Sequence, residues 1–319
     1  MHALVTGGAG FLGSHLCDSL ASRDWNVTIL DDFSVGSRDN LSHLLREHSK
    51  NVTVIEGDCR DPVAVGKALK GVDTLYHFAA NPEVRLDRND PATCFQQNIF
   101  ATYTLLEGVK SHPDVHSVVF ASSSTVCGEP ETIPTPENYG PLIPISLYGA
   151  SKLASEALVN GYGRTFDRTA IILRFANIIG PRSQHGVIFD FAEKLGRNPT
   201  QLEILGDGTQ EKSYLYVTDC ISAIEAASKT AQIDVALYNI GSEDQVLVTK
   251  IAEIVAEEAG LKNVSFTCTG GVDGGRGWKG DVKKMLLDVG KLKSLGWKPQ
   301  LSSEDAVRKT ASGLLHPMT

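Results

Sequence analysis

The chain has 319 residues, of which 42 % are hydrophobic and 21 % are charged, and its formal net charge is −8. These values are typical of a globular protein with one large domain or two smaller ones. The negative charge argues against a nucleic-acid partner, because binding a phosphate backbone needs a basic face.

Short apolar segments alternate with longer amphipathic ones through the first half of the chain. Strand–helix alternation with continuously apolar strands is typical of a parallel sheet covered by helices on both faces. We therefore expect an α/β fold, a doubly wound Rossmann sheet. Its strands are predicted at 2–6, 26–30, 51–56, 73–78, 117–121 and 169–175, with helices such as 11–23 and 91–110.

After residue 175 the pattern changes to loops rich in Gly, Pro and Asn, with short regular segments between them. This change predicts a smaller C-terminal α/β lobe. We expect a first domain at 1–175, with 214–241 returning to its sheet, and a second lobe formed by 176–213 and 242–319.

Cysteine usage and apolar segments bear on the compartment. The six cysteines are widely spaced, with neither a CxxC pair nor a metal-like cluster, so we expect reduced thiols, no metal site and a cytoplasmic location. The first strand begins at residue 2 and no apolar segment is long enough to cross a bilayer. We therefore expect neither a signal peptide nor a membrane partner.

The sequence "VTGGAGFLGSH" places Gly7, Gly10 and Gly13 between the first predicted strand and the first helix. Glycine there permits a tight turn and lets the backbone approach a pyrophosphate at the helix N-terminus. The spacing GxxGxxG also occurs in ordinary turns, but a strand before it and a helix after it favour a dinucleotide site.

Acidic residues follow the next two strands. Asp31 and Asp32 end the second strand, where a carboxylate accepts hydrogen bonds from the adenosine ribose and repels a 2′-phosphate. NAD is therefore the expected cofactor, with Asp58 near the adenine. Arg38 could in principle bind a 2′-phosphate, but the preferred interpretation is a solvated arginine at a helix start.

The segment "SLYGASK" places Tyr148 four residues before Lys152, on one face of a predicted helix. A nearby ammonium favours the phenolate, so we expect the pKa of Tyr148 to fall from its ordinary value toward neutrality. Taken alone, the pair is either a general base with its activator or two residues that share a face by chance.

Together these motifs resemble the extended short-chain dehydrogenase/reductases, and within them the UDP-glucose (UDP-galactose) 4-epimerases of archaeal type. The resemblance spans nearly the whole chain. Its segments are "YHFAA" (76–80), "AANPEVR" (79–85), "FASSSTVCGE" (120–129), "YGASK" (148–152), "LRFANIIGPR" (173–182), "LGDGTQEKSYLYVTD" (205–219) and "GRGWKGD" (275–281).

The resemblance implies roles for particular residues. Tyr148 is then the catalytic acid/base, Lys152 its activator, and Ser123 the accompanying hydroxyl, with Ser124 beside it on the sugar side. The cofactor site is expected to comprise Gly7, Gly10, Phe11, Leu12, Gly13, Asp31, Asp32, Asp58, Cys59, Phe78, Ala79, Ala80, Asn98, Tyr148 and Lys152.

The same resemblance places a UDP-sugar in the second lobe. Asn177 matches an asparagine that contacts the UDP diphosphate or the sugar, and Asp281 matches an aspartate that holds the uridine ribose. Val187 is also expected in this site. The family's phosphate arginine before "GD" is replaced by Trp278, so we expect Arg276 and Lys212 to bind the diphosphate. Cys127 stands where the family usually has tyrosine.

The implied activity is NAD-dependent interconversion of UDP-galactose and UDP-glucose through a 4-keto sugar, by a homodimer. Related 4,6-dehydratases and decarboxylases need carboxylates where this chain has Ser124 and Thr125. Two alternatives stay open: a 4-epimerase of another UDP-sugar (N-acetylhexosamine, glucuronate or pentose), and a non-catalytic NAD-sensing protein.

Overall fold

The computed structural model describes residues 1–83, 90–229 and 235–316, so parts of the predicted segments 79–85, 214–241 and 242–319 lie outside it. The chain forms two compact units. Unit 1 comprises Met1–Val126, Leu147–Arg174 and Ile221–Tyr238, and unit 2 comprises Cys127–Ser146, Phe175–Cys220 and Asn239–Thr319. Residues 127–146 thus group with unit 2, although they belong to the first half of the sequence.

A seven-stranded sheet organises unit 1, in the order β11-β6-β5-β4-β1-β2-β3. The pairs β1–β2, β2–β3, β1–β4 and β4–β5 are parallel. The predicted doubly wound fold is therefore confirmed. The strands are β1 (His2–Thr6), β2 (Asn26–Asp31), β3 (Val52–Glu56), β4 (Thr74–His77), β5 (Ser117–Ser123), β6 (Thr169–Phe175) and β11 (Val235–Ile240).

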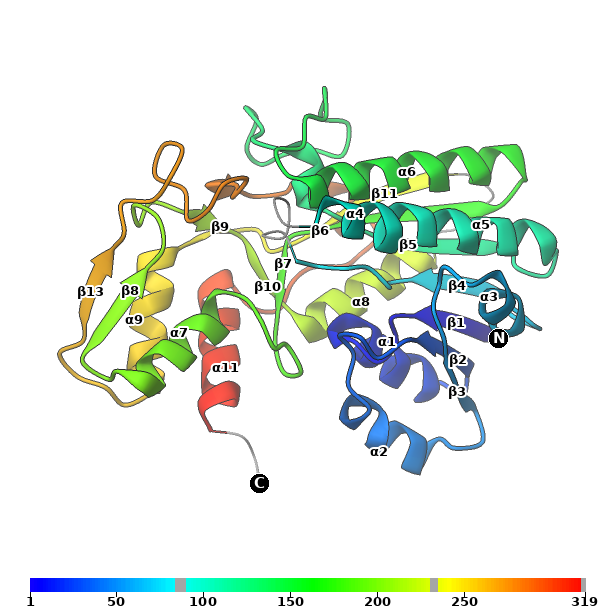
Figure 1. Cartoon of the computed structure of the whole chain (residues 1–319), viewed down its shortest axis with the longest axis horizontal. Helices are drawn as coiled ribbons and strands as arrows, with labels where there is room; N and C mark the ends of the chain where they lie inside the picture. Colours follow the sequence, from blue (N-terminus) through cyan, green and yellow to red (C-terminus); the bar gives the residue numbers. More distant parts are fainter. Residues whose placement is uncertain (84–89, 230–234, 317–319) are drawn as a thin grey trace. The chain divides into compact units, whose positions relative to one another are not determined.

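Helices cover both faces of this sheet. Figure 1 shows α5 and α6 along one face and α1 and α8 along the other. The central strands are buried because both of their faces are covered, which explains their continuously apolar sequence. The helices are α1 (Phe11–Ala21), α2 (Asp39–Glu47), α3 (Pro62–Ala68), α5 (Ala101–Ser111), α6 (Leu147–Thr165) and α8 (Val217–Ser228).

The helix predicted at 91–110 is interrupted. A short helix α4 (Pro91–Cys94) leads into a π-helix, η2 (Phe95–Phe100), before α5 begins. The apolar periodicity continues through the π-turn, so the sequence predicted one helix. Such turns are frequent at functional sites, and this one contains Asn98.

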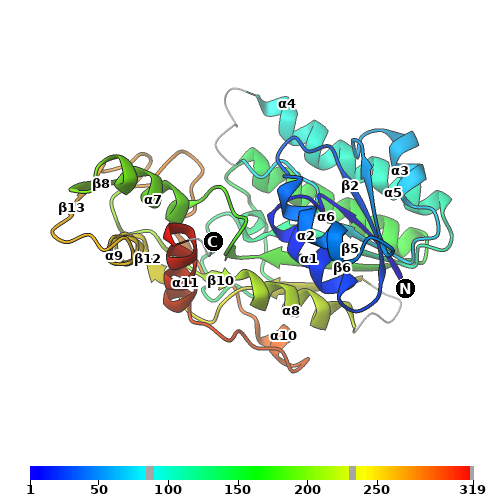
Figure 2. The same ribbon diagram turned by 90° about the horizontal axis from the view of Figure 1, so that it is seen from below.

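Unit 2 has a separate core built around three helices. α7 (Val187–Arg197), α9 (Val248–Glu258) and α11 (Ser303–Leu315) pack together beside the parallel pair β8 (Gln201–Ile204) and β13 (Ser265–Cys268), as Figure 2 shows. β10 (Tyr214–Tyr216) pairs with β7 (Asn177–Ile179), not with the main sheet that the sequence suggested. Its remaining elements are β9 (Glu211–Lys212), β12 (Val246–Leu247), β14 (Lys284–Met285) and α10 (Gly290–Lys293).

Candidate functional site

The glycine turn of unit 1 is closely packed. Gly7 has φ +68°, and a Cβ on it would lie 2.8 Å from the Ala79 backbone. A Cβ on Gly13 would lie 2.1 Å from the Gly7 carbonyl oxygen, so neither position accepts a side chain without rearrangement. In front of Gly10 the space is open, since a Cβ there would meet one described atom, the Gly7 oxygen at 3.2 Å.

Helix α1 starts directly behind this turn, with Gly10 as its N-cap. Within the described structure no side chain caps it. The first N–H groups of an α-helix have no acceptor within the helix, and they attract anions. Phe11, Leu12 and Gly13 supply these groups here. The turn and the helix start therefore fit the pyrophosphate of a dinucleotide.

Asp31 ends β2 beneath the turn and is buried. Its carboxylate accepts the Ala9 N–H at 2.9 Å and the Phe33 N–H at 2.8 Å, which ties the glycine turn to the strand end. Burial raises the pKa of Asp31, and the two backbone hydrogen bonds oppose that shift. Two lone-pair positions of the carboxylate remain for other donors.

The other acidic residues predicted here have local partners. Asp32 accepts hydrogen bonds from the Ser34 N–H and hydroxyl. Asp58 binds the Arg60 guanidinium, which lowers the pKa of that carboxyl, and Cys59 beside it is a buried thiol. The sequence analysis missed Arg60, although its place two residues after Asp58 was visible.

Arg38 is exposed, pairs with Glu56 and lies 4.1 Å from the centre of the Phe33 ring. This arrangement agrees with a solvated arginine at the start of α2. It gives no support to a site for a 2′-phosphate.

The segment after β4 joins the glycine turn to η2. The Phe78 N–H donates to the Thr6 carbonyl, and the Ala79 N–H donates to the Thr6 hydroxyl at 3.3 Å. Ala80 follows in the same partly buried loop. These contacts place residues 78–80 directly beside Gly7.

Asn98 on the π-helix connects this loop to α6. Its side-chain oxygen accepts the Asn81 N–H at 2.8 Å, and its amide donates to the Ser151 hydroxyl at 2.9 Å. Ser151 in turn donates to the Tyr148 carbonyl at 2.8 Å. Asn98 is buried and therefore helps to fix the first turn of α6, where Tyr148 lies.

Three hydroxyl groups meet where β5 ends. Thr125 Oγ1 donates to Ser123 Oγ at 2.9 Å, which leaves the Ser123 hydrogen for the Tyr148 oxygen. The Ser123 hydrogen bond lowers the pKa of Tyr148, but burial is the larger cause and raises it to about 12. Ser124 begins the 3-10 turn η3 (Ser124–Cys127) beside them.

The predicted fall in the Tyr148 pKa is wrong for this structure. Lys152 Nζ lies 5.9 Å from the centre of the Tyr148 ring, over its face, and donates to the Ala121 carbonyl at 2.8 Å. Burial also lowers the pKa of Lys152 itself to about 8. The two residues do share a helix face, but desolvation is the largest cause of the pKa shift of each.

Two buried groups near this pair were not predicted. Glu156, one turn after Lys152, accepts hydrogen bonds from Arg174 and Ser122. His77 lies between Thr6 and Thr102, at 2.9 Å from each hydroxyl, and burial lowers its pKa to about 3. The four-residue spacing from Lys152 could have indicated Glu156.

The substrate residues predicted in unit 2 form two ion pairs. Lys212 Nζ lies 2.6 Å from Asp281 Oδ1 and 5.5 Å from the centre of the Trp278 indole. The second Asp281 oxygen accepts the Gly277 N–H at 3.2 Å. Arg276 pairs with Glu129. Each predicted cation therefore has a carboxylate partner.

The remaining predicted residues of unit 2 lie on different elements. Asn177 starts β7 and donates to the Ser213 carbonyl at 3.1 Å, while Val187 starts α7. Cys127 is buried at the end of η3. Asn177, Val187 and Cys127 all belong to unit 2.

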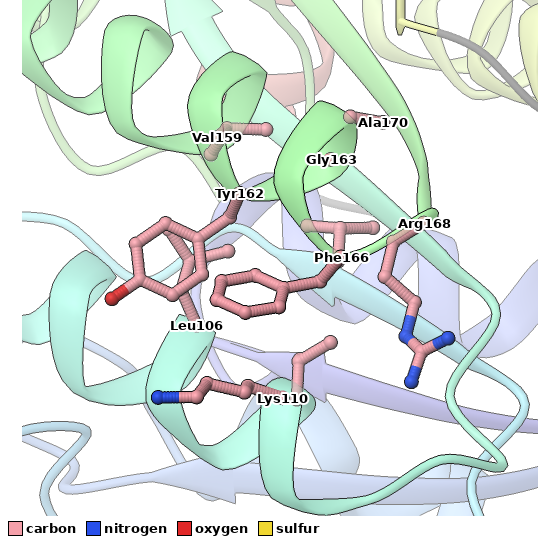
Figure 3. Close-up of a pocket in the computed structure, with 10 residues that line it drawn as sticks. Leu106, Lys110, Val159, Tyr162, Gly163, Phe166, Arg168 and Ala170 are labelled. Carbon is pink, nitrogen blue, oxygen red and sulfur yellow. The ribbon is translucent and has the colours of Figure 1, made fainter.

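A small pocket lies elsewhere in unit 1, between α5 and the C-terminal half of α6. Figure 3 shows that Tyr162 and Phe166 line it, with Lys110 and Arg168 beside them. It contains none of the predicted site residues. In the described part of the chain, no group of three metal-ligating residues and no helix fit to span a membrane is found.

Comparisons with known proteins agree with this geometry. The model of the NAD dependent epimerase/dehydratase family matches residues 3–241. The chain belongs to this family. The family and its cofactor NAD, both predicted from the sequence, are thereby confirmed.

Individual relatives cover nearly the full length. A solved structure described as UDP-galactose 4-epimerase is 41 % identical, covers 100 % of both chains and has a TM-score of 0.87. The UDP-glucose 4-epimerase of Mycolicibacterium smegmatis is 30 % identical and covers 97 % of both chains. A Bacillus cereus UDP-glucuronic acid 4-epimerase, solved with UDP-glucuronic acid and NAD, is 30 % identical, covers 98 % of both and has a TM-score of 0.86.

Proposed function

We propose that this protein is an NAD-dependent 4-epimerase that interconverts UDP-galactose and UDP-glucose. The observation that carries the proposal is the hydroxyl chain from Thr125 through Ser123 to Tyr148, with Lys152 alongside, in the same unit as the dinucleotide turn. The 41 % identity to a UDP-galactose 4-epimerase over the whole chain supports the choice of sugar.

NAD would be held by Gly7, Gly10 and the start of α1 at its pyrophosphate, and by Asp31 at its adenosine ribose. Asp58 and Cys59 border the adenine, and Phe78, Ala79, Ala80 and Asn98 form the wall beside Gly7. When bound, NAD accepts a hydride from a sugar carbon and returns it. The protein supplies the orientation and the acid–base groups.

Tyr148 would act as the acid/base. As a phenolate it accepts the proton of the sugar 4-hydroxyl, and as a phenol it returns it. Ser123 donates to the Tyr148 oxygen and so stabilises the phenolate, while the Lys152 ammonium adds positive charge beside the ring. Ser123, Tyr148 and Lys152 all belong to unit 1.

Substrate binding is assigned to unit 2. Arg276 and Lys212 would bind the diphosphate, Asp281 the uridine ribose, and Asn177 and Val187 the sugar side. Ser124, which belongs to unit 1, would also contribute to the sugar side. The ion pairs Lys212–Asp281 and Arg276–Glu129 mean that an incoming diphosphate competes with carboxylates already in place. Binding would therefore require at least one of these pairs to open.

Elimination of water is disfavoured by the residues after β5. Ser124 and Thr125 carry hydroxyls, and a hydroxyl cannot replace the carboxylates that a dehydratase uses to remove one proton and deliver another. A second candidate substrate is UDP-glucuronate, favoured by the likeness to the Bacillus cereus enzyme solved with that sugar.

One incubation tests the proposal. UDP-galactose carrying deuterium at C4 should give UDP-glucose with deuterium at C4, without label from solvent, because one carbon loses and regains the hydride. Parallel incubations with UDP-glucuronate and UDP-N-acetylglucosamine rank the substrates. Loss of the C6 oxygen, or accumulation of one equivalent of NADH, would contradict an epimerase.

We also propose a cytoplasmic homodimer. Phe100, the last residue of η2, and Tyr103 on α5 are exposed aromatic residues that offer apolar area for pairing. Helix α5 also borders the pocket of Figure 3. Sedimentation of the wild type and of a Phe100→Ser/Tyr103→Ser variant tests this, since a monomeric wild type would exclude it.

A further inference from the structure

A buried carboxylate lies directly behind the Tyr148–Lys152 pair. Glu156 occupies α6 one turn beyond Lys152 and is 5 % exposed. Arg174 on β6, 3 % exposed, donates to both of its oxygens, at 2.9 Å from Nε and 2.8 Å from Nη2. Ser122 on β5 donates to it at 2.5 Å. Glu156 therefore joins β5, α6 and β6 beneath the candidate site.

Glu156 is also the acidic group that acts on Lys152. Burial lowers the pKa of Lys152 to about 8, and the charge of Glu156 opposes that shift. Two other titratable groups lie near Lys152, Tyr148 on α6 and His77 on β4, while Arg174 is bound to Glu156 itself. His77 stays neutral above pH 3, because burial depresses its pKa.

We propose that Glu156, fixed by Arg174 and Ser122, is a positioning residue that keeps Lys152 protonated and holds the end of β5 in register with Tyr148. The role of the charge in turnover rests on the epimerase function proposed above; the effect on Lys152 does not. The neighbour of Ser122 in the chain is Ser123, so anchoring Ser122 also fixes the residue that donates to Tyr148.

The direct test is the titration of Lys152 in the full-length protein, followed by NMR with ¹³C-labelled lysine and assigned by the loss of its signal in Lys152→Met. The wild-type midpoint is expected near pH 8. Glu156→Gln keeps the shape but removes the charge, and it should lower the midpoint by about 1 unit. Glu156→Asp keeps the negative charge, so its Lys152 midpoint should lie close to the wild-type value.

A matched control is Glu225→Gln, which removes a carboxylate paired with Arg23 on another part of unit 1. It should leave the Lys152 midpoint unchanged. Glu156→Gln leaves Arg174 buried without its partner, so this variant could fail to fold. Glu156→Leu/Arg174→Met removes both charges together and is expected to fold. Because the two charges are opposite, its Lys152 midpoint should lie between those of the wild type and Glu156→Gln.

The pH profile of UDP-galactose turnover gives the second measurement. Its alkaline limb should move to lower pH by the same amount in Glu156→Gln, whereas a purely structural role would lower the rate equally at every pH. The inference is overturned if the Lys152 midpoint stays at the wild-type value in both variants that lack the carboxylate, Glu156→Gln and Glu156→Leu/Arg174→Met. A shifted midpoint in a protein that turns over no UDP-sugar would sink the proposed function alone.

Discussion

The Lys152 ammonium lies over the Tyr148 ring, 5.9 Å from its centre, and donates to the Ala121 carbonyl at 2.8 Å. In this arrangement the lysine places a positive charge near the phenol. Its recorded hydrogen bond goes to the Ala121 carbonyl, not to Tyr148. The hydroxyl of Tyr148 takes its hydrogen bond from Ser123 instead. Desolvation therefore controls the pKa of Tyr148, and the Ser123 hydrogen bond opposes it.

Replacing Tyr148 by Phe should reduce UDP-galactose turnover by about 10²–10⁴-fold, the usual contribution of a general acid–base group. NAD affinity should change little. Because the pKa of Tyr148 is raised to about 12, its absorbance in the protein without NAD should show phenolate only at strongly alkaline pH. The nicotinamide ring of NAD⁺ is positively charged, so bound NAD⁺ should move that titration to lower pH. Near-normal turnover of the variant would remove Tyr148 from the mechanism.

The wild type should bind NAD more tightly than NADP, because the Asp31 carboxylate repels a 2′-phosphate. Asp31→Ala should weaken NAD binding by about tenfold, roughly 1.4 kcal/mol, and narrow the gap to NADP. Fluorescence titration with NAD and with NADP measures both affinities for the wild type and for Asp31→Ala. Since Asp31 also holds Ala9, a thermal melt must show that the variant is folded. Equal wild-type affinities would refute the ribose assignment.

His77 should make stability depend on acid pH. The pKa of His77 is about 3 in the folded protein and about 6.5 in the unfolded chain, so between these values the unfolded chain binds the extra proton. The free energy of unfolding therefore decreases as pH falls from about 6.5 toward 3, by about 1.4 kcal/mol per pH unit. Urea unfolding at pH 6 and pH 4 measures this decrease. Between these two pH values, the free energy of unfolding should fall less in His77→Gln than in the wild type.

The matched control for this measurement is His116→Gln, an exposed histidine of the same unit. It should retain the wild-type slope. An identical slope in wild type and His77→Gln would mean that His77 is not the neutral, buried group that the structure shows.

Arg276→Gln should raise KM for UDP-galactose about tenfold to a hundredfold, the effect of losing a hydrogen bond to a charged group. The kcat should change less. Glu129→Gln frees the guanidinium from its carboxylate and should lower KM. Arg197→Gln removes an exposed cation of unit 2 as a control. If KM stays unchanged in Arg276→Gln but rises in Lys212→Gln, the diphosphate belongs to Lys212.

Local pattern alone determined much of unit 1. Continuous apolar strands, a GxxGxxG turn and Asp31 at a strand end specify a parallel sheet with a dinucleotide turn, because each feature acts over a few residues. The four-residue spacing of Tyr148 and Lys152 likewise predicted a shared helix face. Helix 91–110 was the exception, since apolar periodicity does not distinguish a π-turn from an α-turn.

Tertiary structure decided what depends on contacts between distant segments. Burial, not the lysine, controls the pKa of Tyr148, and the amount of burial follows from packing that no local pattern encodes. The pairs Lys212–Asp281 and Glu156–Arg174 join residues 69 and 18 positions apart, and their charges are matched only once the chain has folded. The sequence analysis named Lys212 and Asp281 but not Glu156 and Arg174, and only the fold determines which charges neutralise one another and which stay available to a substrate.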